Sequence, residues 1–227
     1  YGYHMSKEVK DIQRALVETL CRKLTHCRMC KSSSLTDYLD LGQTAPADQF
    51  RTVEEIDVPE ITYPLRVALC NDCGLSQLTH VVDPRVLYQF DYPYESSITA
   101  TGKKHWNDFA RAVVSRLGLS KDSLVVDVGS NVGTLLSSFK DEGMRVSGID
   151  PAPNIVETAN QEGIPTICDF YSDESAAKVA GLHGKAKVIV GTNVFAHIDD
   201  LDAVFGANEI LLDEDGVFIF ESPYFVN

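Results

Sequence analysis

The sequence has no long hydrophobic run and no leader of the kind that directs secretion. Its 227 residues are 44% hydrophobic with a mean hydropathy of −0.08, and no stretch approaches the roughly 18 apolar residues that mark a membrane span. A basic start followed by an apolar segment and a cleavage site is missing, so we expect a cytoplasmic protein that does not use a membrane. Residues 1–5, which end in a Met, are typical of a cloning remnant and are left out of the fold prediction.

Positive charge is scarce in the second half of the chain. The formal net charge is −13, and residues 121–227 hold 18 of the 33 acidic residues but only 6 of the 20 Lys and Arg. An acidic chain repels a phosphate backbone, so we expect no nucleic-acid partner. The more balanced first half is better suited to an anionic substrate, and the change near residue 120 indicates two functional parts.

Cysteine is also sparse, but four of the six cysteines form two C-x-x-C pairs separated by 39 residues. Two such pairs provide a tetrahedral four-sulfur site of the kind that Zn²⁺ favours. Disulfides or a redox C-x-x-C are the alternatives, but a redox motif needs one pair and no secretory leader supports disulfides. We therefore predict a structural zinc, since four thiolates leave no open position. The predicted ligands are Cys27, Cys30, Cys70 and Cys73.

Hydrophobic periodicity predicts an amphipathic helix over 6–24, extended segments at 39–42 and 63–69, and helices at 83–90 and 103–117. After residue 120 the pattern alternates. The predicted strands are 124–128, 145–149, 164–167, 186–190 and 216–221, and the predicted helices are 132–142, 152–162, 173–182 and 200–212.

This alternation predicts an α/β fold with a doubly wound, mostly parallel sheet, preceded by a small zinc-binding module. We expect an N-terminal helical segment over 1–26, the zinc module over 27–82, a helical linker and substrate lid over 83–120, and the α/β core over 121–227.

A glycine loop follows the first strand of this core. It reads Asp127-Val128-Gly129-Ser130-Asn131-Val132-Gly133, which is not the Gly-x-Gly-x-x-Gly fingerprint of dinucleotide sites. Glycines at the start of a helix let a ligand approach the backbone, and Asp150, 21 residues beyond Gly129, can accept from both ribose hydroxyls. This combination predicts S-adenosylmethionine as the cofactor, with a purely structural turn as the alternative.

Two later strand ends face the same crevice. Asp169 can accept from an adenine amino group and Phe170 can line the ring, unless Asp169 merely caps the following helix. Asn193 can hold the methionine end. His197 is a candidate proton acceptor, although a structural histidine that pairs with a neighbouring aspartate is the alternative.

The chain also resembles the sugar 3-C-methyltransferases that act on nucleotide-linked deoxysugars. The resemblance spans nearly the whole sequence. Its motifs include Leu39-Asp40-Leu41-Gly42, Cys70-x-x-Cys73-Gly74-Leu75, Asp91-Tyr92-Pro93-Tyr94-x-Ser96-Ser97, Val128-Gly129-Ser130-Asn131, Gly148-Ile149-Asp150-Pro151 and Asn193-Val194-Phe195-Ala196-His197-Ile198. The family resemblance implies a zinc module, a Rossmann-like class I methyltransferase core that binds S-adenosylmethionine, and a 4-keto sugar substrate, commonly on dTDP, that is methylated at C3.

The resemblance also supplies candidate site residues. The predicted cofactor-binding residues are Asp127, Gly129, Ser130, Asn131, Gly133, Asp150, Pro151, Asp169, Phe170 and Asn193. The predicted substrate-binding residues are Tyr92, Tyr94, Ser96, Ser97, Lys103 and His105, and the predicted catalytic residues are His197, Tyr92 and Tyr94. A structural lid is the alternative for the Tyr/Ser segment, and Arg66, Arg85 and Lys104 are further candidates for the diphosphate. A small-molecule O- or N-methyltransferase and a non-catalytic zinc-stabilised fragment that binds the cofactor are the alternative functions.

The sequence departs from the family pattern at its end. A class I core has seven strands and we count five, and the family's C-terminal domain and its Tyr/Glu/His cluster lie beyond residue 227. Residues 217–220 are therefore expected to form an open apolar edge, which soluble proteins avoid. We expect a second chain or a further C-terminal segment to cover it.

Overall fold

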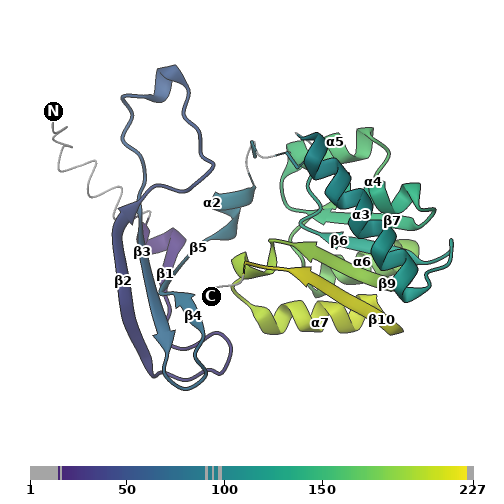
Figure 1. Cartoon of the computed structure of the whole chain (residues 1–227). Coiled ribbons are helices and arrows are strands. Elements are labelled where there is room, and N and C mark those ends of the chain that lie inside the picture. The colour runs from purple at the N-terminus through teal and green to yellow at the C-terminus, as the bar shows by residue number, and fades with distance from the viewer. Residues whose placement is uncertain (1–14, 16, 90–91, 94, 97–98, 224–227) are drawn as a thin grey trace. The chain divides into compact units, whose positions relative to one another are not determined.

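The chain folds as two compact units, residues 1–93 and 94–227. The computed structural model describes residues 15, 17–89, 92–93, 95–96 and 99–223 (Figure 1). The predicted linker and lid over 83–120 does not form a segment of its own in this division. Its first helix lies in the first unit and its second helix in the second unit, because that second helix packs on the large sheet.

The first unit consists of short strands and long connections. Its labelled elements are β1 (Cys21–Lys23), β2 (Leu35–Thr44), η1 (Val53–Glu55), β3 (Tyr63–Cys70), β4 (Ser76–Leu78), β5 (His80–Val82) and α2 (Pro84–Tyr88). Strands β2, β3 and β4 form an antiparallel sheet in that order, and β1 pairs with β5. Asp83 caps α2 by accepting from the Arg85 amide, and Pro84 occupies its first turn, as the sequence predicts.

The N-terminal helix ends earlier than predicted. Residues 15 and 17–20 are helical, but Cys21–Lys23 is a strand, so the prediction of helix to residue 24 is wrong there. Cys21 pairs with Val82 and Lys23 with His80 in the β1–β5 ladder. The ladder forms hydrogen bonds with backbone N–H and C=O groups, some of which would have no partner at the end of a helix. The pairing partner is far away in the sequence, so the local hydrophobic periodicity cannot predict it. The remainder of the predicted helix, 6–14 and 16, lies outside the described residues.

The second unit alternates strands and helices. Its elements are α3 (Ala100–Leu117), β6 (Leu124–Val128), α4 (Thr134–Asp141), β7 (Arg145–Asp150), α5 (Pro153–Gln161), β8 (Thr166–Cys168), α6 (Asp173–His183), β9 (Ala186–Thr192), η2 (Phe195–His197), α7 (Leu201–Leu211) and β10 (Leu212–Glu221). Its five strands pair entirely in parallel, in the order β10-β9-β6-β7-β8.

Helices cover both faces of this sheet (Figure 1). Val125 and Val188 pack with residues of α3, α4 and α5 in one hydrophobic cluster, whereas Val126 and Ile189 pack with residues of α6 and α7 in the other. From β6 the chain continues to β7 and β8 on one side of the sheet, and from β9 it continues to β10 on the other side. The carboxyl ends of β6 and β9 are therefore a topological switch point, and open α/β sheets bind ligands in the crevice at such a point. The predicted α/β fold, doubly wound and parallel, is confirmed.

The described residues contain no helix that is long and apolar enough to cross a membrane.

Candidate functional site

The loop between β6 and α4 has an unusual backbone. Gly129, Asn131 and Gly133 all have positive φ, at 67°, 51° and 81°. The amide groups of Gly129 and Ser130 both donate to the Ile149 carbonyl, at 2.8 and 3.3 Å, which ties the loop to the neighbouring strand β7. A loop that turns this tightly at a helix N-terminus exposes backbone amides to a ligand.

Both loop glycines are required by close packing. A Cβ atom on Gly129 would lie 2.8 Å from Val194 Cγ2, and one on Gly133 would lie 2.9 Å from Ile164 Cγ2. Larger residues therefore meet a clash as well as an unfavourable φ. Val194 follows β9, so the loop and the β9 turn are in direct contact.

Asp150 ends β7 beside this loop and is buried. Its Oδ2 accepts from the Asn131 amide and its Oδ1 from the Ala152 amide, both at 3.0 Å. Burial raises the pKa of Asp150, and the two amide hydrogen bonds act in the opposite direction. Each carboxylate oxygen can accept a second hydrogen bond, so the group keeps capacity for a diol.

Asp127, two residues before Gly129, is buried. Its Oδ1 is one of the buried side-chain atoms that have no hydrogen-bond partner among the described residues. Burial, and then the charge of Asp150, raises the pKa of Asp127 well above its usual range. The site therefore combines one hydrogen-bonded carboxyl with one that is poorly solvated.

The ends of β8 and β9 place the other predicted residues. The Asp169 amide donates to the Asp150 carbonyl at 3.1 Å, and the Asp169 carboxylate accepts from the Phe170 amide at 2.9 Å. The alternative that Asp169 caps α6 is wrong, because Ser172 is the N-cap residue of that helix and accepts from the Ser175 amide.

Asn193 follows β9 with φ of 57°, and its side chain donates to Glu221. His197 is exposed on the short helix η2, and Asp200, by accepting from the Ala203 amide, caps α7. Sequence reasoning missed Glu221 and Val194. The sequence offered only weak signals for them. Glu221 is an acidic residue at the end of a predicted strand, and Val194 is an apolar residue in a predicted loop.

Ser96 is anchored to the glycine loop. Its amide donates to Asn131 Oδ1 at 2.9 Å and its hydroxyl to Thr134 Oγ1 at 3.2 Å. Since the Asn131 amide in turn binds Asp150, a continuous chain of contacts joins Ser96 to the acid at the end of β7. Tyr94 and Ser97, predicted to lie nearby, are outside the described residues.

The other predicted substrate residues are distributed over both units. In the first unit the Tyr92 hydroxyl donates to Asp48 Oδ2 at 3.5 Å. In the second unit Lys103 and His105 are exposed on α3, where the His105 ring packs edge-on against Trp106. The further phosphate candidates Arg66, Arg85 and Lys104 form ion pairs with Asp40, Asp83 and Asp108.

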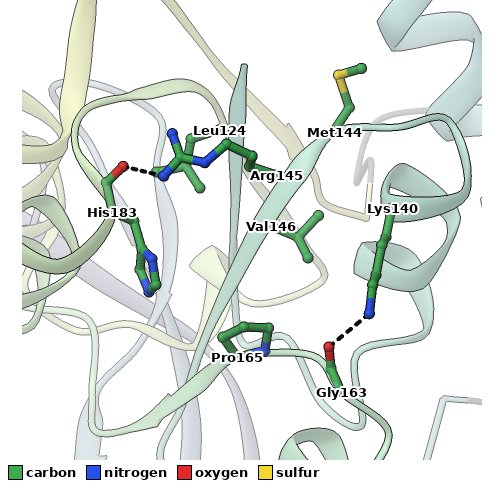
Figure 2. A pocket seen from close by; sticks show the side chains of 8 residues that line it. All are labelled: Leu124, Lys140, Met144, Arg145, Val146, Gly163, Pro165 and His183. Atoms are coloured by element: carbon green, nitrogen blue, oxygen red, sulfur yellow. Dashed lines mark hydrogen bonds between the residues drawn. The ribbon is translucent and has the colours of Figure 1, made fainter. Parts of the chain in front are cut away.

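A cavity of about 310 Å³ lies at the opposite end of the large sheet (Figure 2). It is lined by the first residues of β6 and β7, Leu124 and Arg145, and by Lys140 and His183. Lys140 donates to the Gly163 carbonyl at 2.9 Å and Arg145 to the His183 carbonyl at 2.7 Å, so the two cations point to different walls. This cavity is separate from the crevice at the carboxyl ends.

The four paired cysteines converge in the first unit. Their sulfur atoms all lie within 4.8 Å of one another, with 3.6 Å between Cys27 and Cys73 and 3.5 Å between Cys30 and Cys70. A tetrahedral zinc with bonds of about 2.3 Å requires sulfur separations of about 3.8 Å, so the cluster fits the ion. Cys27 and Cys70 are buried.

The two C-x-x-C turns share one backbone design. In each, the first cysteine accepts at its carbonyl from the amide four residues later, which belongs to Lys31 in one turn and to Gly74 in the other. Both residues have positive φ, 62° and 77°. Amide hydrogen bonds, chiefly from Cys73 and then from Asp72, lower the pKa of Cys70 to about 7, which favours the thiolate that binds zinc.

Each of the two units contains a segment that matches a known protein family. Residues 27–88 match a family described as "Putative zinc binding domain", and residues 103–225 match the family described as "Methyltransferase domain". The chain belongs to the methyltransferase family. The predicted arrangement, a zinc-binding module followed by a methyltransferase with S-adenosylmethionine as its cofactor, is therefore confirmed.

One relative matches over most of the sequence. The C-methyltransferase NovU of Streptomyces niveus is 35% identical over 210 residues, which are 92% of this chain and 50% of that protein. The chain thus spans about half the length of this relative.

Solved structures similar to this chain include two S-adenosylmethionine-dependent methyltransferases. The protein from Clostridium acetobutylicum is 21% identical over 52% of this chain and 49% of its own, with a TM-score of 0.41. The protein from Archaeoglobus fulgidus is 14% identical over 53% of each chain, with a TM-score of 0.45.

The described residues fit the cofactor of this family. The crevice presents a glycine loop with close backbone approach, a buried carboxyl at the end of β7, and the unpartnered Oδ1 of Asp127. Asp150 keeps acceptor capacity for a diol, and Asp127 Oδ1 is an unpartnered acceptor next to the loop, so the two acids suit a ligand that carries hydroxyl and ammonium donors.

Proposed function

We propose that this chain is part of an enzyme that methylates C3 of a 4-keto deoxysugar nucleotide, commonly a dTDP-sugar, with S-adenosylmethionine as the methyl donor. The observation that carries the proposal is the 35% identity to a protein named as a C-methyltransferase over 92% of this chain. The motif resemblance in the Tyr/Ser segment and after β9 supports the sugar substrate.

Cofactor binding is assigned to the crevice at the carboxyl ends of β6, β7 and β8. Asp150 would accept from the ribose hydroxyls, and the loop from Gly129 to Gly133 would lie against the methionine portion. Asp169 and Phe170, which follow β8, would hold the adenine, with Pro151 at the same edge. When bound, S-adenosylmethionine supplies an electrophilic methyl group.

Substrate binding is assigned to the segment that precedes α3. Ser96 donates to Asn131 and Thr134 at the glycine loop, and this contact supports a substrate site next to the proposed cofactor site. Tyr92, Tyr94 and Ser97 are the other substrate-binding residues of this proposal. Lys103 and His105 on α3 would contact the diphosphate.

The reaction needs a proton acceptor and an oxyanion donor. A ketone at C4 acidifies the proton on C3, and removal of that proton leaves an enolate whose carbon is the nucleophile. Tyr92 or Tyr94 would donate a hydrogen bond to the enolate oxygen. His197, exposed on η2 after the β9 turn, would accept the proton or orient the group that does.

Replacement of Asp150 tests the cofactor assignment. Asp150→Asn keeps one acceptor oxygen but removes the charge, so we expect binding of S-adenosylhomocysteine to weaken by about tenfold or more. Titration calorimetry measures this, with the exposed Asp141→Asn on α4 as the control. Unchanged affinity in Asp150→Asn would remove Asp150 from the site.

Isotope exchange tests the substrate assignment. In deuterated water, the chain should exchange the C3 proton of a dTDP-4-keto-6-deoxysugar but not that of the corresponding 4-hydroxy sugar. Exchange requires only the base and the oxyanion donor, so it does not depend on methyl transfer. Cofactor binding without exchange would instead favour the fragment that binds S-adenosylmethionine without turnover, for which the half-length match to the relative is the supporting observation.

A further inference from the structure

The turn after β9 is held by a two-point contact with the end of β10. The backbone amide of Asn193 donates to the Glu221 carbonyl at 2.8 Å, and its side-chain Nδ2 donates to Glu221 Oε1 at 3.1 Å. Glu221 is the last residue of β10 and pairs with Thr192 in the parallel ladder. The contact fixes Asn193 in the left-handed region, with φ of 57°, which few residues adopt without local hydrogen bonding.

This turn determines where the next residue lies. Val194 packs on the glycine loop so closely that a Cβ atom on Gly129 would lie 2.8 Å from its Cγ2 atom. The same side chain lies over Gly191, where an added Cβ atom would be 2.9 Å from Val194 Cγ1. The Val194 side chain therefore packs between the end of β9 and the loop that follows β6.

The turn also carries the short helix with His197. The Val194 carbonyl accepts from the His197 amide at 2.9 Å, and the Phe195 ring packs edge-on against Phe218, with centroids 4.9 Å apart. A change in the backbone angles of Asn193 would therefore move both Val194 and His197.

We propose that Glu221 is a positioning residue of the cofactor site, acting through Asn193 to hold Val194 against Gly129. The inference rests on the proposed function, because it assumes that the loop around Gly129 binds the cofactor. The hydrogen bonds that Glu221 accepts from the described residues come from Asn193 and not from the loop. By accepting from Asn193 Nδ2, the Glu221 carboxylate holds the Asn193 side chain in one conformation. This fixes the position of Val194, the residue that faces the loop.

Affinity for S-adenosylhomocysteine measures the effect of this acceptor on the cofactor site. Glu221→Ala removes the acceptor and should weaken binding about 5- to 10-fold, as expected for one hydrogen bond. Glu221→Gln retains Oε1 as an acceptor and should stay within twofold of the parent. Glu209→Ala, an exposed residue on α7 with the same change of charge, is the matched control.

Asn193 provides the second arm. Asn193→Gly keeps the left-handed backbone without strain but removes the side-chain donor, so it should weaken binding as much as Glu221→Ala. The double variant Glu221→Ala/Asn193→Gly should lose no more than either single variant, since both remove the same contact. Full affinity in Asn193→Gly, or additive losses in the double variant, would overturn the proposal.

Hydrogen exchange of the amides at 193–198 tests the contact without any ligand. Glu221→Ala should accelerate exchange in this peptide, whereas Glu221→Gln should not. If the parent does not bind S-adenosylhomocysteine, the proposed function fails, and the exchange experiment still decides whether Glu221 holds the turn. Unchanged exchange in Glu221→Ala overturns the proposal, as does a Glu221→Gln variant that loses affinity as severely as Glu221→Ala.

Discussion

At the scale of single residues, the two acids near the glycine loop have different environments. Asp150 receives two backbone hydrogen bonds, whereas Asp127 has an unpartnered oxygen and no solvent contact at that atom. An ionised carboxylate is costly to bury without partners. The folded protein therefore favours the neutral, protonated form of Asp127 more strongly than the unfolded chain does.

This difference gives a pH-dependent prediction. Because the folded pKa of Asp127 lies above its unfolded value, the native state binds the additional proton, and stability falls as pH rises from about 4 through the folded pKa. Asp127→Asn cannot ionise, so its stability relative to the parent should be greater at pH 8 than at pH 4, by about 1–3 kcal/mol.

Thermal unfolding at both pH values, with zinc content checked, measures this effect. Asp122→Asn, an exposed residue before β6, is the control. A stability difference between Asp127→Asn and the parent that does not change with pH would contradict the assignment of the neutral acid.

At the scale of elements, the second C-x-x-C turn depends on its glycine. Gly74 has φ of 77° and open space around it, so Gly74→Ala meets no clash and changes only the backbone preference. We expect it to destabilise the zinc-bound protein by about 1 kcal/mol and to accelerate zinc loss to a chelator. Gly181→Ala is the matched control, because Gly181 also has open space but lies in helix α6, where alanine is favoured. Equal effects of the two substitutions would contradict the prediction.

Strand β10 is an edge of the sheet that the described residues form. Phe220, with 60% of its surface exposed, stands on this strand next to Phe218 and Phe195. An exposed apolar edge favours pairing with another chain, so Phe220→Lys should reduce self-association of this chain. Sedimentation velocity over a concentration series measures it. Leu182→Lys on α6, where Leu182 is 65% exposed, should leave the association unchanged.

At the scale of the whole molecule, the two units differ in what stabilises them. Among the described residues of the first unit, only Cys27, Tyr63, Ala68 and Cys70 are buried apolar residues, and two of these are predicted zinc ligands. The second unit contains two hydrophobic clusters. A unit with so small a core needs the free energy of metal binding to remain folded.

Removal of zinc should therefore affect the units unequally. We expect chelation to abolish hydrogen-exchange protection in strands β1 to β5 while strands β6 to β9 remain protected. Exchange measured by mass spectrometry before and after chelation tests this, and restored protection on addition of zinc is the control. Simultaneous loss of protection in both units would show that the second unit depends on the first.

Much of the second unit could be predicted locally. Strand β6 begins and ends where the sequence predicts, and α4, α5, α6 and α7 lie within two residues of their predicted bounds, because continuous apolar runs and capping residues are local signals. The same holds for the cysteine pairs, whose spacing alone identifies a four-sulfur site.

The sequence by itself thus determined the fold class, the cluster of four cysteines and the acid that follows the second core strand, because periodicity and cysteine spacing are properties of short segments. Only the tertiary structure decided that Cys21–Lys23 pairs with β5, that Ser96 binds the glycine loop, and that Glu221 holds the turn at Asn193. Each of these contacts joins residues that lie 28 or more positions apart. Their closeness follows from how the strands and helices pack together, and no local pattern encodes it.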